Sequence, residues 1–313
     1  MNNLNEKNNQ LYELLNQTSC PDFDRVLTNA TIVIGIGTSG SKAVNTLFRM
    51  LEQSPSGIPE GVLFIVADVD KDGRKQDSLA EISQIAFIPM GSDGAGTNTE
   101  NGRRIAENYY EDIKSAIEKA MVTLIENDGM ETQFNLPAGT LQSVFLVGGS
   151  GGGAAGGGMD VFVTASHHAK RSVGLEQLKI NQWRIGSQIP THDVTRTASS
   201  DAQERIPANS ADNFEASYIQ MNTKRYMTEK PPVGEPFEIE MSVRTFANVE
   251  FDNVSRGHRI QTNEDLIHVM GGCLQAQIFT AAGKENSSRH IDDFILGTTG
   301  QTNRATGSPI SEK

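Results

Sequence analysis

The chain is poor in cysteine and has no long apolar segment. Its two cysteines, Cys20 and Cys273, lie far apart in no metal-binding or redox spacing, which favours two thiols in a reducing cytoplasm over a disulfide. No stretch approaches the ~18 apolar residues of a membrane-spanning helix. The polar start, MNNLNEKNNQ, lacks the basic and apolar segments of a signal peptide. We therefore expect a soluble, cytoplasmic protein with no transmembrane segment.

Positive charge is also scarce. The formal net charge of -12 over 313 residues argues against a nucleic-acid-binding surface, because a phosphate polymer would be repelled. The P-loop pattern, GxxxxGK followed by Ser or Thr, is absent, which excludes that mode of phosphate binding. The hydrophobic content of 37% still suffices for the packed core of one large α/β domain or two ordinary ones.

Glycine, by contrast, is abundant, with 30 residues that cluster after apolar, β-branched runs. Four such runs are expected to form buried strands: Thr31–Ile36, Gly61–Asp68, Ile85–Met90 and Ser143–Val147. Helical patterns follow at Lys42–Leu51, from Gly102 to about Glu126, and up to about Ser172. Continuous apolar strands that alternate with helices predict a three-layer α/β fold, with a mostly parallel sheet covered by helices on both faces.

The second half of the chain has weaker patterns. Between Asn181 and Pro207 we expect a short strand and then a long surface loop, followed by a helix from about Asp212 to about Met227. An alternating strand is expected at Phe237–Val243. A long apolar helix with an N-terminal capping signal is expected at Asn263–Ala282.

The first glycine loop, Gly35–Gly40, has the pattern GxGxxG between a predicted strand and a predicted helix. Glycines allow the tight turn, and the helix N-terminus would present unpaired N–H groups and a positive dipole to a phosphate. Asp68 ends the second strand, where a dinucleotide-binding fold has the acid that holds a ribose. This loop alone leaves an NAD(P)-dependent oxidoreductase open.

Two further glycine loops follow the third and fourth strands, at Gly94–Asn98 and Gly148–Gly158. The second of these lies between a buried strand and an amphipathic helix, which argues against a flexible linker. A dinucleotide fold needs one phosphate loop. Three loops at the carboxyl ends of parallel strands suit a triphosphate with its metal better.

The order of these loops resembles that of the tubulin/FtsZ superfamily. Gly35–Asn45, GIGTSGSKAVN, is similar to the first phosphate loop of FtsZ, and Ala67–Asp70, ADVD, is similar to the loop after its second strand. Gly94–Arg103, GAGTNTENGR, is close to the FtsZ pattern GAGxNxExGR and is the most specific match. Gly151–Gly158 stands where the superfamily has its GGGTG cluster, and Asp212–Ala216 resembles a tubulin helix whose asparagine reads guanine. The later segment also resembles large tubulin-like proteins of bacteria.

The resemblance implies GTP or GDP as the ligand, with Mg²⁺ as an optional companion, and head-to-tail self-association. Asn213 and Asn263 would recognise the base. The residues that the resemblance assigns to the rest of the nucleotide are Gly35, Gly37, Thr38, Ser39, Gly40, Ser41, Asp68, Asp70, Gly94, Ala95, Gly96, Thr97, Asn98, Glu100, Arg103, Gly151, Gly152, Gly153, Ala154, Ala155, Gly156 and Gly157.

Two departures from the family pattern bear on hydrolysis. The signature threonine of the glycine cluster is alanine in either alignment frame, Ala154 or Ala155, which removes a phosphate hydrogen bond of roughly 1–3 kcal/mol. Arg289–Asp293 resembles the loop whose acid completes the neighbouring subunit's site, so Asp292 and Asp293 are the candidate catalytic residues; an ordinary helix cap is an equally good interpretation. Few residues follow, and we expect the family's second domain to be absent.

We therefore expect a GTP-binding, tubulin-like protein that polymerises head to tail and hydrolyses GTP weakly or not at all, at a site completed between subunits. Two alternatives stay open: an NAD(P)-dependent oxidoreductase with a Rossmann fold, and a tubulin-like scaffold that no longer hydrolyses GTP. The expected parts are a polar extension (1–28), a GTP-binding domain (29–260), a long helix with the candidate catalytic loop (261–296) and a disordered tail (297–313).

Overall fold

A computed structural model gives the fold of the chain. It describes residues 30–53, 57–59, 61–68, 85–91, 94–126, 143–176, 178–187, 200–223, 225–226, 237–238, 241–248 and 263–279. Asp70, the candidate catalytic residues Asp292 and Asp293, and the predicted tail lie outside these ranges. Within them, no helix is both long and apolar enough to cross a membrane.

A six-stranded parallel sheet forms the centre of the molecule. Its strands are β1 (Thr31–Ile36), β2 (Val62–Asp68), β3 (Ile85–Pro89), β4 (Ser143–Gly149), β5 (Lys179–Ser187) and β8 (Met241–Asn248). They lie in the order β3-β2-β1-β4-β5-β8, and every neighbouring pair is parallel. This order reverses direction between β1 and β4, as it does in doubly wound folds. Such folds bind ligands where the order reverses, outside the carboxyl ends of the strands.

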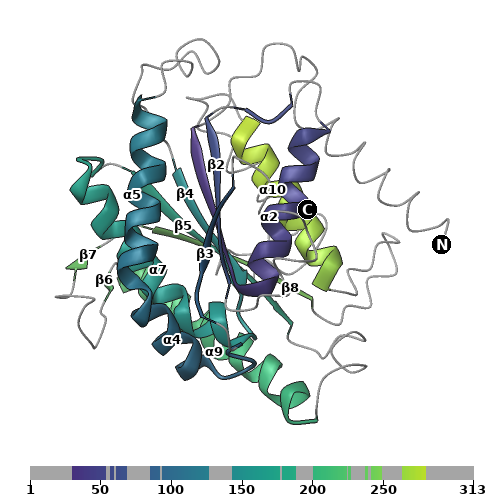
Figure 1. Cartoon of the computed structure of the whole chain (residues 1–313). Helices are drawn as coiled ribbons and strands as arrows, with labels where there is room; N and C mark the ends of the chain where they lie inside the picture. The colour runs from purple at the N-terminus through teal and green to yellow at the C-terminus, as the bar shows by residue number, and fades with distance from the viewer. Residues whose placement is uncertain are drawn as a thin grey trace.

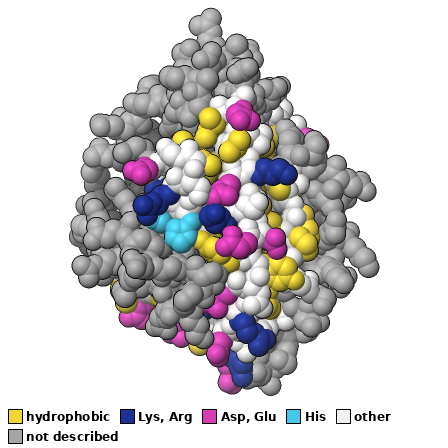
Figure 2. All heavy atoms as spheres, turned by 60° about the vertical axis from the view of Figure 1, so that its left-hand side comes forward, with side chains coloured by type: hydrophobic (Ala, Val, Ile, Leu, Met, Phe, Trp, Pro, Cys, Tyr) yellow, Lys and Arg dark blue, Asp and Glu magenta, His cyan; other side chains and the backbone are white. Residues whose placement is uncertain are grey.

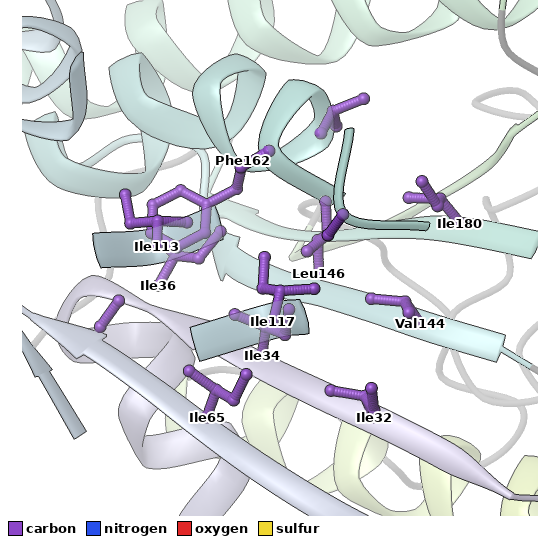
Figure 3. Close-up of a cluster of buried hydrophobic side chains, with 14 of the residues drawn as sticks. Ile32, Ile34, Ile36, Ile65, Ile113, Ile117, Val144, Leu146, Phe162 and Ile180 are labelled. Atoms are coloured by element: carbon purple, nitrogen blue, oxygen red, sulfur yellow. The ribbon is translucent and has the colours of Figure 1, made fainter. Parts of the chain in front are cut away.

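Helices cover both faces of the sheet, and successive side chains of β1 point alternately into the two layers of core beneath them. Helices α4 (Thr99–Asn108), α5 (Tyr110–Glu126) and α7 (Gly153–Ser172) lie on one face, while α2 (Gly37–Glu52) and α10 (Asn263–Phe279) lie on the other (Figure 1). Ile32, Ile34 and Ile36 enter the core beneath α5 and α7, which Figure 3 shows, whereas Val33 packs on the α2 and α10 side. The three-layer α/β fold with a parallel sheet is confirmed.

Several elements differ from their predicted bounds. The predicted helix 102–126 is two helices, α4 and α5, with Tyr109 between them. Helix α9 runs from Ser200 to Thr223, so it begins where a surface loop was predicted and contains Pro207. The strand predicted at 237–243 is a short β7 (Phe237–Glu238), antiparallel to β6 (Arg225–Tyr226), followed by the longer β8.

Candidate functional site

Three glycine-rich turns meet at the carboxyl edge of the sheet. Strand β1 passes directly into α2 at Gly37, and β4 passes through Ser150–Gly152 into α7. The register joins them, because Ile36 of β1 pairs with Gly148 of β4. Loop 94–98 reaches the same place, since the Gly153 amide donates a 2.7 Å hydrogen bond to Gly96 O. The structure therefore brings the three predicted phosphate loops together.

Glycine is required where these backbones touch. A Cβ on Gly40 would lie 2.4 Å from Val147 O, and one on Gly153 would lie 2.6 Å from Asn98 O. Both distances are shorter than any real Cβ contact, and the neighbour in each case is backbone that cannot turn aside. The glycines at these two positions therefore allow α2 to approach β4, and α7 to approach loop 94–98.

The N-termini of α2 and α7 lie side by side. A Cβ built on Gly37 would lie 3.1 Å from the Cβ of Ala154, so the first turns of the two helices are in contact. Among the described residues, no side chain caps either helix, and neither first turn contains an acid. The Gly153 amide is already paired with Gly96 O, but the other first-turn amides and the positive ends of the two helix dipoles converge on one place, which is the physical requirement for an anion site.

Helix α4 begins differently, although it follows a predicted phosphate loop. The Asn98 side chain accepts a 2.9 Å hydrogen bond from the Asn101 amide, and Glu100 lies in the first turn. Asn98 and Glu100 thus satisfy the N-terminus of their own helix. Arg103 forms a 3.1 Å ion pair with Glu107 one turn further along α4.

The side chains of the first loop divide between solvent and the core. Thr38 is exposed and Ser39 is partly exposed, whereas Ser41 is buried. Ser41 Oγ lies 2.9 Å from Gly37 O and 3.3 Å from Asp68 Oδ2, so it links the first turn of α2 to the end of β2. The Asp68 carboxylate is 4% exposed. In this structure it supports α2 from within the protein, which weakens its expected role as a ribose ligand.

The two alanines that replace the signature threonine have different surroundings. Ala154 is partly exposed beside Gly37, at the joint N-termini. Ala155 is 4% exposed in the core beneath α7, and its Cβ would be only 2.6 Å from a Cβ on Gly148. Position 154 is therefore the one at which a hydroxyl group would face the site.

Helix α9 carries one predicted site residue and one that sequence reasoning missed. Asn213 Nδ2 donates a 2.9 Å hydrogen bond to Ser150 O, in the turn before α7. Asn209 Nδ2 lies 2.9 Å from Thr97 O and 3.2 Å from Gly151 O, and so contacts two of the glycine loops. The spacing of four residues between the two asparagines is the signal that could have identified Asn209, but it requires that segment to be helical.

The remaining predicted residues are placed less completely. Asn263 is the first residue of α10, and its backbone alone is described. Gly156 lies in the second turn of α7, where a Cβ would approach Ser150 O at 2.8 Å, and Gly157 packs against α4. Gly94, Gly96 and Gly152 are exposed to solvent, and Ala95 is buried.

A hollow lies away from these turns, between α5 and α7. It has a volume of about 360 Å³ and is lined by Tyr110, Glu111, Lys114, His168, Arg171 and Ser172. Tyr110 Oη contacts His168 Nδ1, and burial raises the pKa of Tyr110 to about 12 and lowers the pKa of His168. The face in Figure 2 shows basic, acidic and histidine side chains mixed together. This mixture of charges gives the hollow no clear preference for an anion.

Comparisons with known proteins agree with the loop pattern. No family model matches the chain. The cell division protein FtsZ of Mycoplasmopsis pulmonis (strain UAB CTIP) is 32% identical over 109 residues, which are 33% of this chain and 25% of that protein. The predicted resemblance to the tubulin/FtsZ superfamily is confirmed.

Solved structures of CetZ, FtsZ and TubZ proteins are also similar to this chain. They include CetZ2 from Haloferax volcanii as a GTPγS-bound protofilament (18% identity, TM-score 0.49, 83% of this chain and 62% of that one). An empty FtsZ dimer from M. jannaschii has 15% identity, a TM-score of 0.46, and coverage of 90% and 61%. TubZ of Clostridium botulinum phage c-st has 13% identity, a TM-score of 0.45, and coverage of 84% and 65%. The chain spans less than two thirds of the length of each of these proteins.

Proposed function

We propose that this chain binds GTP or GDP at the carboxyl edge of its sheet and polymerises head to tail under the control of that nucleotide. The observation that carries the proposal is the pair of adjacent helix N-termini, α2 and α7, without side-chain caps in the described residues. Their amides and dipoles favour a polyanion. Loop 94–98 lies against the start of α7 and supplies a third set of amides for the terminal phosphate.

The strand order alone does not distinguish this proposal from NAD(P) binding, because dinucleotide-binding folds have the same order. Two observations favour the triphosphate. A dinucleotide fold uses one glycine-opened helix for its pyrophosphate, whereas two such helices meet here. In addition, the acid that would hold a ribose in an oxidoreductase, Asp68, is buried against Ser41.

Recognition of guanine is assigned to Asn213 and Asn263. Guanine presents N1–H and N2–H donors on one edge, so it needs an acceptor such as a carboxamide oxygen. The Asn213 amide nitrogen already donates to Ser150 O, which fixes this side chain close to the turn before α7. That position supports a role for Asn213 near the nucleotide.

Polymerisation is supported by the family resemblance and by the CetZ2 relative, whose structure is a nucleotide-bound protofilament. We propose that hydrolysis is slow in this chain. Ala154 provides no hydroxyl group at the joint N-termini, and loss of one such contact typically lowers turnover about 10²–10³-fold. Asp292 or Asp293 would act on the nucleotide of the next subunit.

Competition binding tests the nucleotide. The purified chain would be titrated with fluorescent GTP and then with unlabelled GTP, GDP, ATP and NADH. We expect GTP and GDP to displace the probe and ATP and NADH to fail. Tight NADH binding, with no effect of GTP on thermal stability, would refute the proposal. Light scattering against protein concentration tests polymerisation separately, with GDP in place of GTP as the matched control.

A further inference from the structure

Helix α9 contacts two of the glycine loops through one carboxamide. Asn209 Nδ2 lies 2.9 Å from Thr97 O in loop 94–98 and 3.2 Å from Gly151 O in the turn before α7. A carboxamide nitrogen has two hydrogens, so it can donate to both carbonyls at once. Asn209 thereby joins segments that come from different strands of the sheet.

The backbone of α9 fits closely against the same turn. A Cβ on Gly151 would lie 2.6 Å from Ile206 Cγ2 and 2.8 Å from Ile206 O, so only glycine permits this approach. Ser210, the next residue after Asn209, is fully buried. The docking of α9 therefore holds Asn209 at a fixed place beside both carbonyls, and Asn209 itself is only partly exposed.

Backbone hydrogen bonds help to hold loop 94–98 in place. Gly96 O accepts from the Gly153 amide at 2.7 Å, and Asn98 N donates to Ala95 O at 3.0 Å within the loop. The hydrogen bond from Asn209 to Thr97 O comes from outside both the loop and α7. By contrast, the first turn of α2 is supported by Ser41 and packs on β4.

We propose that Asn209 is a positioning residue that fixes loop 94–98 against the N-terminus of α7, and so sets the preference for a nucleoside triphosphate over a diphosphate. The inference rests on the proposed function, in which this loop contacts the terminal phosphate. Loss of Asn209 frees the loop but leaves the α2 turn in place. The affinity for GTP therefore falls more than the affinity for GDP.

The chemistry of the side chain suggests a graded set of variants. Asn209→Leu keeps a similar volume and removes both donors. Asn209→Asp keeps the shape, but directs a carboxylate at two carbonyl oxygens and adds negative charge near the phosphates. Asn209→Gln keeps the two donors on a longer side chain and serves as the conservative rescue. Asn108→Leu and Asn108→Asp, at an exposed position on α4, are matched controls.

The experiment measures the dissociation constants of GTP and GDP for the full chain and each variant. Loss of two partly buried hydrogen bonds is expected to weaken the binding of GTP to Asn209→Leu about 10-fold, and the binding of GDP less than about 3-fold. Asn209→Asp should weaken GTP binding further, whereas Asn209→Gln should recover part of the lost affinity. The Asn108 variants should bind both nucleotides as the wild type does. Amide hydrogen exchange of the nucleotide-free proteins should show faster exchange within residues 94–98 for Asn209→Leu.

Two outcomes would overturn the inference. Equal losses for GTP and GDP would show a general structural role, and unchanged affinities with unchanged exchange would show no role at all. If Asn209→Leu does not fold, Asn209→Gln and Asn209→Asp provide the same comparison of the two nucleotides. Failure of the proposed function looks different: the wild-type protein then binds neither nucleotide, although exchange in loop 94–98 still depends on Asn209.

Discussion

The N-terminus of α4 and the N-termini of α2 and α7 are constructed in opposite ways. Helix α4 has an asparagine cap and an acid in its first turn. In the described structure α2 and α7 have neither, and they begin next to each other. A helix that satisfies its own N–H groups gains stability, whereas one that does not retains the capacity to bind an anion. Under the proposed function, this comparison predicts that phosphate binding depends most on the N-termini of α2 and α7.

The largest expected effect comes from placing an anion at the joint N-termini. In Ala154→Asp the new carboxylate occupies the place proposed for a phosphate, so the affinity for GTP should fall more than about 100-fold through repulsion at short range. The free energy of unfolding should not fall, because an acid in the first turn of α7 is favourable. Calorimetric titration and urea unfolding measure the two quantities. Ala211→Asp, exposed on α9, is the matched control. Unchanged affinity would place the phosphates elsewhere.

A pair of threonine variants distinguishes the exposed alanine from the buried one. Ala155→Thr introduces a methyl and a hydroxyl group into a tightly packed part of the core, and should lower the free energy of unfolding by about 2 kcal/mol. Ala154→Thr should leave stability nearly unchanged and increase GTP affinity about 10-fold, since it restores a hydroxyl at the site. Urea unfolding and GTP titration check both. The opposite pattern would mean that position 155, and not 154, faces the nucleotide.

The other end of α7 should respond to pH. Burial, together with the positive charges of Lys170, His168 and Arg171, lowers the pKa of His167 from 6.5 to about 4. The unfolded chain therefore binds the proton more readily than the folded protein, and stability present above pH 6.5 is lost as the pH falls toward 4. Between pH 7.5 and pH 5.5 we expect a loss of about 1 kcal/mol in urea unfolding. His167→Leu should show a clearly smaller loss. An identical pH dependence in that variant would assign the effect to other groups.

The smallest effect is expected at the α4 cap. Asn98→Ala should cost about 0.5–1 kcal/mol of stability, because the Asn101 amide loses its acceptor. GTP affinity should change less than about 3-fold if Asn98 serves its own helix and does not contact phosphate. Thermal unfolding and GTP titration test this, and Asn108→Ala at the exposed end of α4 is the control. A large loss of affinity with little loss of stability would make Asn98 a direct ligand.

The strands that carry apolar side chains on both faces of the sheet could be predicted from the sequence. The runs that became β1, β2 and β4 are almost entirely buried, and a continuous apolar run has few alternatives to a central parallel strand. The run that became β3 lies at the edge of the sheet and is buried only in part. The glycine turns were predictable for the same reason, since each follows such a strand. The contact of Gly153 with loop 94–98 was not, because it depends on how two helices pack.

Helix α9 shows why the rest could not be predicted. Pro207 and a polar composition favour a loop locally, because proline removes a helical hydrogen bond and restricts the residue before it. In the folded protein, contacts at long range stabilise the helix and offset this local preference. They include the hydrogen bonds of Asn209 and Asn213 to the turns. Local propensity contains no information about these partners. Asn209 was therefore missed, because the helix was predicted to begin only at about Asp212.

The packing of α4 on α7 has a mechanical consequence. A Cβ on Gly102 would lie 1.9 Å from Gly153 O, and one on Gly157 would lie 1.7 Å from Thr99 O. At these points the two backbones touch without side chains between them, so no flexible side chain can adjust when one helix moves relative to the other. A small movement of loop 94–98 on loss of a phosphate would shift α4 as a stiff body. The shift would then reach Tyr109, where α4 ends and the chain continues into α5.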